Sequence, residues 1–513
     1  MSTKLSRMTP LCLLAILFSG ACSTASSSLS DAEDRRDATA LADDAVADSA
    51  DGAHDDAGQS DLQAADGAGD GPASDGLAVN PLPWRGGLLA FGGAGQHTPT
   101  ALAVDKQGRV ILGGRTHAGT RFQIGQHGFT AQGEDGWVVM LTPGGAVDWL
   151  RPASSTGFAM VNDVVSRGSY IFVLGQFDGT LTLGQSQLKS IVGHQRDLFV
   201  ARLTDDGRVD WLRRYGGTAA EFPRRLAVDA QGNVYVAATL WESTTIDGKQ
   251  HINSDAPRKQ MLLIKLNATG AVLWSQSYGG AADDEIARIV IDTDGLTPHF
   301  CGTFGGTVSF GAQSFKSAGH VDVFCLTVAP QTGAIVAAAV IAGPGPQYVG
   351  DLAVAGSELL VGVHAGTLAE LAPGVTVQAV PKSTAAAIVR YRPGWKLAGH
   401  QPLLSPGAVS WPLVAFGSGT EVVASHFLGQ LSWRKQSVLG SSTAYRPFLG
   451  THSSAQTTLV AFSADDPAFV HELGVRPGGA PALVGTFEKT LALSSAATPI
   501  SRSAFGMLWL YAP

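Results

Sequence analysis

Five ionisable residues stand about one repeat length apart and could together bind a ligand. They are His97, Asp163, Glu221, Asp284 and Asp351, and successive members are separated by 58 to 67 residues. Carboxylate oxygens coordinate hard cations and accept hydrogen bonds from hydroxyl groups, so a ring of them could hold calcium or a polyhydroxylated molecule. The alternative is structural, because loop Asp and Glu side chains commonly accept hydrogen bonds from backbone N–H groups of their own or the next unit. The sequence favours the structural role, and we expect no cofactor, with calcium as the one ion to test.

Two cysteines could form a disulfide. Cys301 and Cys325 fall on strands that we expect to be neighbours in one sheet. An oxidising compartment would permit a bond between them, but adjacent strands often hold cysteines at an unsuitable Cβ separation. A disulfide and a pair of buried free thiols therefore stand as equal alternatives.

Motifs of known catalytic sites are absent from the sequence. It contains no HExxH, GxSxG or CxxC pattern and no Gly-Lys phosphate loop, and its thirteen histidines show no repeated pair at metal-ligand spacing. Distant segments can still assemble an active site. The absence of motifs therefore favours a protein without catalytic activity but leaves the question open, and we name no catalytic residue.

The elements that must position these residues are strands in a repeat of about 62 residues. Trp149, Trp211 and Trp274 recur at intervals of 62 and 63 residues. Within one unit, the run RRLAVDAQGNVYVAA alternates apolar and other side chains on both sides of an Asp-x-x-Gly turn, which is typical of a β-hairpin. No apolar stripe with the helical period of 3.6 residues interrupts it. The residues from about Gly86 onward divide into seven such units.

Each unit contains four strands, which is the content of one blade of a β-propeller. The array begins with a lone fourth strand, residues 86–91, and ends directly after a seventh third strand near Tyr511. These two pieces complete one blade from both termini, which removes two exposed sheet edges. We therefore predict an all-β fold for residues 83–513: a seven-bladed β-propeller of four-stranded antiparallel blades, closed by the N-terminal strand joining the C-terminal blade.

The repeats resemble those of the bacterial seven-bladed β-propeller repeat proteins found among secreted and surface proteins. The motifs that carry the resemblance are YGGTAAEFPRRLAVDAQGNVYVAA with DLFVARL, and YGGAADDEIARIVID with DVFCLTV. The resemblance covers residues 86–340; in the following unit Gly343-Pro-Gly-Pro replaces the glycine pair. It implies a propeller fold and a location in the cell envelope, but it implies no shared activity.

Each unit also carries about twenty residues between its second and third strands, opened by RFQIG, LTLG, TTIDG or VSFG in the first four units. In a four-stranded blade this connection emerges on the same face as the connection between blades. We therefore expect one extra hairpin per blade to enlarge that face. It is the predicted binding face, with the five ionisable residues in loops around the mouth of the central channel.

The three repeated tryptophans allow two interpretations. Aromatic rings stack on sugars, so Trp149, Trp211 and Trp274 could form a binding platform. Their fixed place in the outermost strand instead favours packing between blades. We expect the packing role.

The N-terminus predicts secretion and attachment to a membrane by lipid. Two basic residues precede the apolar run 11–18, which has the length of a secretory signal core and is too short to span a bilayer. Residues 19–22, Ser-Gly-Ala-Cys, resemble the processing site of bacterial lipoproteins, which implies that residues 1–21 are a signal peptide and that Cys22 carries the lipid. Ordinary cleavage after Ala21 is the alternative. Ser23, in place of the aspartate of inner-membrane retention, favours the outer membrane.

Residues 22–82 are predicted to be a disordered tether. Their Ser, Ala, Asp and Gly side chains cannot bury enough surface to offset the entropy lost on ordering. Residues 31–76 hold fourteen acids and two bases, whereas the chain without them and without the two bases of the signal peptide has 29 acids and 31 bases. The folded part is therefore nearly neutral, which argues against a nucleic-acid partner.

Three functions fit these features. The first is a monomeric, lipid-anchored propeller of the outer membrane or cell surface that binds an unknown protein or glycan. The second is an envelope hydrolase or lyase with a site at the mouth of the channel. The third is a structural envelope protein. The sequence favours the first and does not identify a ligand.

Overall fold

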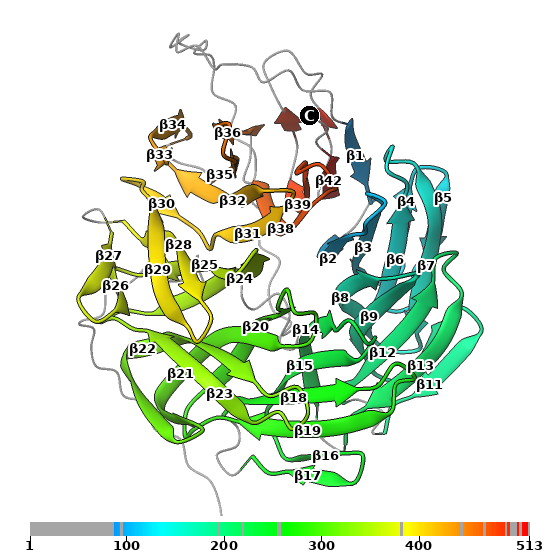
Figure 1. The fold of residues 1–513 in the computed structure, drawn as a ribbon. Helices are drawn as coiled ribbons and strands as arrows, with labels where there is room; N and C mark the ends of the chain where they lie inside the picture. The colour runs from blue at the N-terminus through cyan, green and yellow to red at the C-terminus, as the bar shows by residue number, and fades with distance from the viewer. Residues whose placement is uncertain are drawn as a thin grey trace, which may run out of the picture. The chain divides into compact units, whose positions relative to one another are not determined.

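The computed structural model describes residues 87–92, 96–191, 195–217, 220–253, 258–379, 383–441, 445–464, 468–487, 490–492, 500–501 and 505–510. These residues belong to one compact unit, Val79–Pro513, and form antiparallel β-sheets without a helix (Figure 1). The predicted signal peptide, Cys22 and all of the predicted tether lie outside the described residues. Within the described ranges, no helix has the length and apolar character to cross a membrane.

The described strands form sheets with one recurring order of four strands, and we call each such sheet a unit. The first two units contain β2 (His97–Val104), β3 (Val110–Thr116), β6 (Asp135–Leu141) and β7 (Val147–Ser155), then β8 (Ala159–Arg167), β9 (Tyr170–Phe177), β12 (Asp197–Thr204) and β13 (Val209–Tyr215). The next two contain β14 (Glu221–Val228), β15 (Val234–Leu240), β18 (Gln260–Leu266) and β19 (Val272–Tyr278), then β20 (Asp284–Ile291), β21 (Pro298–Phe310), β22 (Gln313–Val328) and β23 (Ile335–Ile341).

Two further units continue this order. They contain β24 (Gln347–Ala355), β25 (Glu358–Ala365), β28 (Ala385–Arg392) and β29 (Lys396–Leu403), then β31 (Leu413–Gly417), β32 (Thr420–Leu428), β35 (Arg446–His452) and β36 (Thr457–Ala461), with the short β30 (Ala408–Val409) also paired to β32. Successive units are joined through the connection from the fourth strand of one to the first strand of the next.

One sheet is assembled from both ends of the chain. It has the order β1 (Gly87–Phe91), β42 (Phe505–Leu510), β39 (Pro481–Phe487) and β38 (Ala468–Val475). β1 runs antiparallel to β42, with Gly87 opposite Leu510 and Phe91 opposite Gly506. The first described strand thus takes the position of a fourth strand beside the last one.

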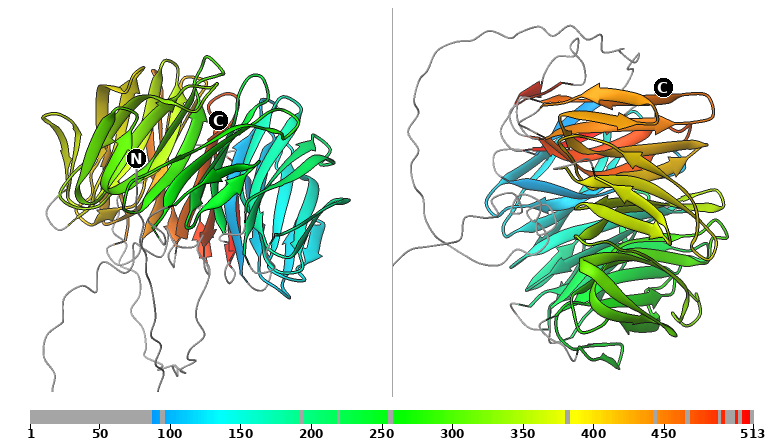
Figure 2. Two further views of the ribbon diagram at one scale, coloured as in Figure 1. Left: turned by 90° about the horizontal axis from the view of Figure 1, so that it is seen from below. Right: turned by 90° about the vertical axis from the view of Figure 1, so that its left-hand side faces the viewer.

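The first strand of each unit, here called the inner strand, lies beside the inner strands of the neighbouring units. In chain order the inner strands are β2, β8, β14, β20, β24, β31 and β38, each packed against the next, and β38 also packs against β2. Figure 1 shows these strands around a common centre, with the later strands of each unit farther out. The same arrangement is seen from two other directions in Figure 2.

The hydrophobic core lies between neighbouring sheets. One cluster joins Ile111 and Val138 of the first unit to Val173 and Phe199 of the second. The third strands β6 and β18 are buried along their whole length because both of their faces contact another sheet. This explains why their sequences, GWVVML and QMLLIKL, are nearly continuous apolar runs.

The sequence predicts that the extra hairpins enlarge one face of the molecule, and this prediction is wrong. They include β4 (Arg121–Ile124) with β5 (His127–Thr130), β10 (Thr180–Leu183) with β11 (Ser186–Lys189), β16 (Thr244–Ile246) with β17 (Lys249–His251), β26 (Leu368–Ala372) with β27 (Val375–Gln378), and β33 (Gln430–Trp433) with β34 (Gln436–Leu439). In the fourth unit the hairpin continues β21 and β22 themselves. The short β37 (Ser463–Ala464), β40 (Thr490–Ala492) and β41 (Ile500–Ser501) pair in a further small sheet.

These hairpins lie instead along the outer edge of the sheets, beside the fourth strand of the preceding unit. β10 pairs with β7 of the preceding unit, and backbone bridges join Ala342 to Glu370 and Leu404 to Ser432 in the same sense. The physical reason is the alternation in their sequences, which buries one side of each hairpin, for example Phe122 and Ile124. Figure 1 shows β16–β17, β26–β27 and β33–β34 at the periphery.

The repeated tryptophans pack between units, as predicted. The indole Nε1 of Trp149 donates a hydrogen bond of 2.8 Å to the carbonyl of Asp205, in the turn between β12 and β13 of the next unit. Trp211 and Trp274 make the equivalent bonds to the carbonyls of Ala268 and Pro330, both at 3.0 Å. The tryptophan repeat is therefore a contact that holds successive sheets in register.

Cys301 and Cys325 form a disulfide. They lie directly opposite each other on β21 and β22, and both are buried. The sequence left a disulfide and a pair of free thiols as equal alternatives, and the structure contains the disulfide.

Candidate functional site

The five residues singled out in the sequence lie on strands rather than in loops, and they fall into two groups. His97, Glu221 and Asp284 are the first residues of the inner strands β2, β14 and β20. Asp163 and Asp351 lie in the middle of β8 and β24, each directly after a β-bulge. They do not form one ring around a channel mouth, because a bulge separates the two positions along the inner strand.

Glu221 and Asp284 hold the connections that precede their strands. The Oε1 atom of Glu221 accepts hydrogen bonds from the backbone N–H of Gly217, at 3.0 Å, and from the hydroxyl of Thr244. Asp284 accepts from the N–H of Gly280 at 2.6 Å. Both side chains are fully buried, and burial raises the pKa of each carboxyl to about 7.

His97 is a neutral residue of the core. Its Nδ1 lies 3.1 Å from the hydroxyl oxygen of Thr116, and its ring packs edge-on against Phe122. Burial, with a smaller contribution from His117, lowers the pKa of His97 to about 4. The side chain therefore carries no charge at neutral pH.

Asp163 and Asp351 bond to the inner strand of the following unit. The Oδ2 atom of Asp163 accepts from the N–H of Leu226 at 2.8 Å, and that of Asp351 from the N–H of Val414 at 3.2 Å. All four carboxylates thus take the structural role that the sequence favoured, bonding to the backbone of their own or the next unit.

The two mid-strand carboxylates also belong to a group that we call the central cluster. It consists of Asp163, Arg225, Arg288, Asp351 and Glu472, each the residue after the bulge of its inner strand. Glu472 of β38 pairs with Arg225 of β14 and lies 3.7 Å from Arg288 of β20. Arg288 in turn donates from Nε to Asp351 at 2.9 Å. The cluster therefore ties the last unit to the third, fourth and fifth.

The charges of the central cluster influence one another because all of them are largely buried. Burial raises the pKa of Asp163 to about 6, although Arg225 opposes this. Burial alone would lower the pKa of Arg288, but Glu472 and Asp351 outweigh it and raise that pKa. Three carboxylates face two guanidinium groups, so at most one negative charge is left over, which suits a structural tie better than a strong ion-binding site.

Sequence reasoning missed Arg225, Arg288 and Glu472. The available signal was register: Asp163, Arg225, Arg288 and Asp351 follow one another at 62, 63 and 63 residues, just before the apolar run of each inner strand. Among the residues that the structure describes, no three His, Cys, Asp or Glu side chains gather where they could hold a metal ion.

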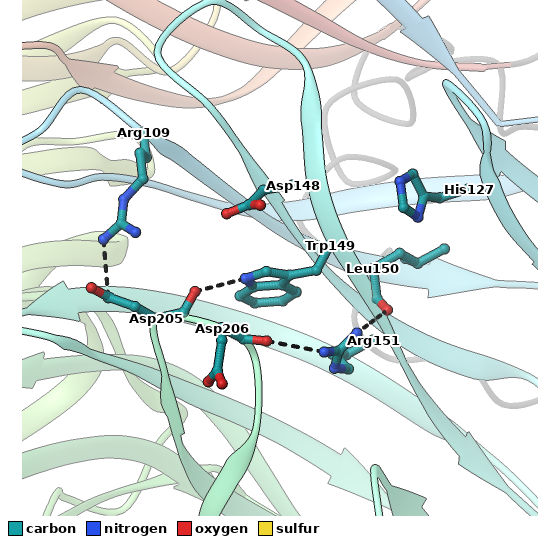
Figure 3. Close-up of a pocket in the computed structure, with 8 residues that line it drawn as sticks. All are labelled: Arg109, His127, Asp148, Trp149, Leu150, Arg151, Asp205 and Asp206. Atoms are coloured by element: carbon teal, nitrogen blue, oxygen red, sulfur yellow. Dashed lines mark hydrogen bonds and ion pairs between the residues drawn. The ribbon is translucent and has the colours of Figure 1, made fainter.

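A polar hollow of about 550 Å³ lies at the junction of the first two units. Figure 3 shows its lining residues: Arg109, His127, Asp148, Trp149, Leu150, Arg151, Asp205 and Asp206. They come from the β2–β3 turn, the β4–β5 hairpin, strand β7 and the β12–β13 turn. The hollow is therefore built around the Trp149 contact between two units.

Part of the polar lining is already engaged. Arg151 donates to the carbonyl of Asp206 at 3.0 Å, and Arg109 forms an ion pair of 3.0 Å with the carboxylate of Asp205 (Figure 3). The side chains of Asp148 and His127 are exposed and make no hydrogen bond or ion pair to another described residue. These two side chains are open to a ligand.

No protein-family model matches the chain, and no curated protein matches its sequence. Solved structures similar to it include the Dos1 propeller, with 8% identity over 83% of this chain and 95% of that one and a TM-score of 0.41. Others are Sqt1 from Chaetomium thermophilum (12% identity, 78% and 97% covered, TM-score 0.37) and the polysaccharide lyase Uly1 (10% identity, 80% and 89% covered, TM-score 0.39). These neighbours are β-propellers, and the likeness concerns the fold alone.

Proposed function

We propose that residues 83–513 form a closed ring of seven four-stranded blades. The pairing of β1 with β42 supports closure, because it completes the last unit with a strand from the other end of the chain. The contact of β38 with β2 supports it independently, since it joins the last inner strand to the first. The central cluster would then cross the axis of the ring.

The ring is held at the cell envelope by a lipid on Cys22, through the flexible tether of residues 22–82. The proposal is supported by the sequence features of the signal and by the polar, acidic composition of the tether. The protein acts there as a monomer at the outer membrane or cell surface.

Its function is to bind a glycan in the hollow around Trp149. The observation that carries this proposal is the pair of unengaged, exposed side chains, Asp148 and His127, in a hollow otherwise lined mostly by charged groups. Sugar hydroxyls both donate to carboxylates and accept from guanidinium N–H groups, so a lining of mixed charge suits them.

A glycan fits this hollow better than a protein partner does. Specific protein interfaces bury roughly 1,200–2,000 Å² around an apolar centre. Of the eight residues lining the hollow, Trp149 and Leu150 alone are apolar. We propose no reaction, because the carboxylates considered for a hydrolase or lyase accept hydrogen bonds from the backbone.

The test is glycan binding by the full mature chain. We expect an array of bacterial envelope glycans to give ligands whose affinity falls about 10- to 100-fold in Asp148→Ala and in His127→Ala, the cost of a lost hydrogen bond to a polar or charged group. Glu242→Gln, which alters an exposed acid outside the hollow, should bind as the parent chain does. Absence of any glycan ligand, or unchanged affinity in both hollow variants, would refute the proposal.

A further inference from the structure

Neighbouring units meet at buried junctions that repeat along the chain. The N–H of Glu221, which begins β14, donates to the carbonyl of Arg196, the residue before Asp197 of β12. One unit later, the N–H of Asp284 donates to the carbonyl of Lys259, the residue before Gln260. Each junction thus brings the start of an inner strand to the start of the third strand in the preceding unit.

The side chains at three successive junctions differ in one respect. The pairs are Asp197 with Glu221, Gln260 with Asp284, and Asp322 with Gln347, at repeat intervals of 62 or 63 residues, and all six side chains are buried. The second and third pairs each combine one acid with one neutral amide. In the third pair the amide of Gln347 donates to the carbonyl of Leu368 at 3.1 Å, and Asp322 accepts from two backbone N–H groups. The first pair consists of two acids.

The junction before these contains a single acid. Asp135 stands one repeat before Asp197, and the inner strand that follows it begins with Ala159. Both oxygens of Asp135 accept from the backbone, one from Gln132 at 3.1 Å and the other from Ser155 at 2.9 Å. A single acid is therefore satisfied by the backbone at this position.

Asp197 and Glu221 each keep one oxygen without a donor. Glu221 uses Oε1 for Gly217 and Thr244, and Asp197 uses Oδ2 for the N–H of Ile191 at 2.8 Å. The remaining atoms, Oε2 of Glu221 and Oδ1 of Asp197, are buried and have no hydrogen-bond partner. They border the same small space, since a Cβ atom added to Gly216 would lie 2.4 Å from the first and 3.0 Å from the second.

We propose that Asp197 and Glu221 share one proton across this junction and that the pair acts as a pH-sensitive lock between the second and third units. The protonated Glu221 then donates to Oδ1 of Asp197, the oxygen that has no other donor. Two ionised carboxylates side by side in a water-excluded space repel each other, and one proton removes that repulsion.

The acid pair fixes three connections between strands by accepting hydrogen bonds from them. The two carboxyl groups hold Ile191 before β12, Gly217 before β14, and Thr244 at the start of β16. The charged group placed against the pair is Arg214 of β13, 3.6 Å from Oδ2 of Asp197.

Burial raises the pKa of Glu221 to about 7 and also raises that of Asp197. A raised pKa means that the stabilisation is complete below the ordinary pKa of a glutamate and is lost as the pH rises through about 7.

The experiment compares the full chain with Glu221→Gln in thermal unfolding between pH 5 and pH 8.5. The amide supplies the donor permanently, so we expect the melting temperatures to differ least at pH 5 and the variant to melt higher at pH 8, by up to about 4 °C for a pKa raised from 4.5 to about 7. The folded-to-unfolded ratio of the variant relative to the parent should rise up to tenfold per pH unit between about 4.5 and about 7, and it should level off above 7, where Glu221 is ionised in both states. Asp284, whose pKa burial also raises to about 7, is present in both chains and cancels in the comparison.

A matched gain-of-function variant makes the test specific. Gln347→Glu creates a second acid pair with Asp322 and should add a further loss of stability, of the same sign, as the pH rises from the ordinary pKa of a glutamate toward neutral. If Glu221→Gln does not fold, Asp197→Asn provides the reciprocal acid–amide pair. Identical pH profiles for the parent and Glu221→Gln would overturn the proposal. So would stabilisation of the parent, but not of the variant, by calcium at pH 8, because a cation rather than a proton would then occupy the pair.

Discussion

Replacing Glu472 by Gln should destabilise the protein more than the loss of one surface charge would. Glu472 pairs with Arg225 and faces Arg288 at 3.7 Å, so one substitution removes the carboxylate partner of two guanidinium groups. The side chains of these three residues are between 14% and 19% exposed, which places the pairs mostly out of contact with water. An unpaired charge left in such a position is costly.

The magnitude follows from the partners that remain. Removing one member of a fully buried ion pair costs about 3–5 kcal/mol. Arg288 keeps Asp351 at 2.9 Å, and the residual exposure permits some hydration, so we expect about 2–3 kcal/mol. For a folded part of about 430 residues the entropy of unfolding is about 0.9 kcal/mol per degree, which gives a fall in Tm of about 2–4 °C.

Differential scanning calorimetry of the full chain measures this change. Asp206→Asn serves as the control, because Asp206 pairs with Arg208 at 3.0 Å on the surface, with both side chains more than half exposed. Surface pairs contribute about 0–1 kcal/mol, so its Tm should stay within about 1 °C of the parent. If Glu472→Gln loses no more stability than Asp206→Asn, the central cluster is not a structural tie and the reasoning is wrong.

Two further changes test the packing between and within units. Gly207 and Gly394 both have φ of +75°, but a Cβ at Gly207 would lie 2.8 Å from the Trp149 ring whereas one at Gly394 would meet nothing within 4 Å. Gly394→Ala should therefore cost about 1–2 kcal/mol for backbone strain and Gly207→Ala about 1–3 kcal/mol more for overpacking, as measured by denaturant unfolding; equal costs would contradict the contact. Cys301→Ser with Cys325→Ser opens a loop with a sequence separation of 24 residues and should lower the free energy of unfolding by about 3 kcal/mol, whereas an unchanged midpoint with and without reductant would show that no disulfide stabilises the chain.

Much of the fold could be predicted because the repeat exposes it. The two-residue alternation and the Asp-x-x-Gly turns mark hairpins such as β14–β15, and the phase of the first and last strands indicates that they pair. The sequence does not show on which side the extra hairpins lie, although Phe122 and Ile124 alternate in a way that requires an apolar surface to cover them. Strand count and strand order follow from local pattern, whereas the position of a hairpin depends on which neighbouring surface is left uncovered.

The central cluster is harder to predict for a related reason. Arg225 and Glu472 are 247 residues apart, and nothing in the sequence near either of them indicates the other. Their contact depends on the arrangement of the inner strands and on the bulges that turn the next residue toward its partners. The sequence shows that Arg225 and Arg288 occupy equivalent positions in the repeat, but it does not show which residues they contact. Likewise, the acid pair Asp197–Glu221 becomes visible only when the junctions are compared side by side.

Closure of the ring by the two ends of the chain is the central claim, and an engineered cross-link tests it most directly. In the register of β1 and β42, Leu89 lies opposite Leu508, so Leu89→Cys with Leu508→Cys should form a disulfide within one chain under mild oxidation. The control pair, Gly87→Cys with Leu508→Cys, is two residues out of register and should remain reduced. Peptide mapping that finds residues 89 and 508 joined within the monomer is the expected result; a reduced pair, or links formed only between chains, would contradict the closed ring.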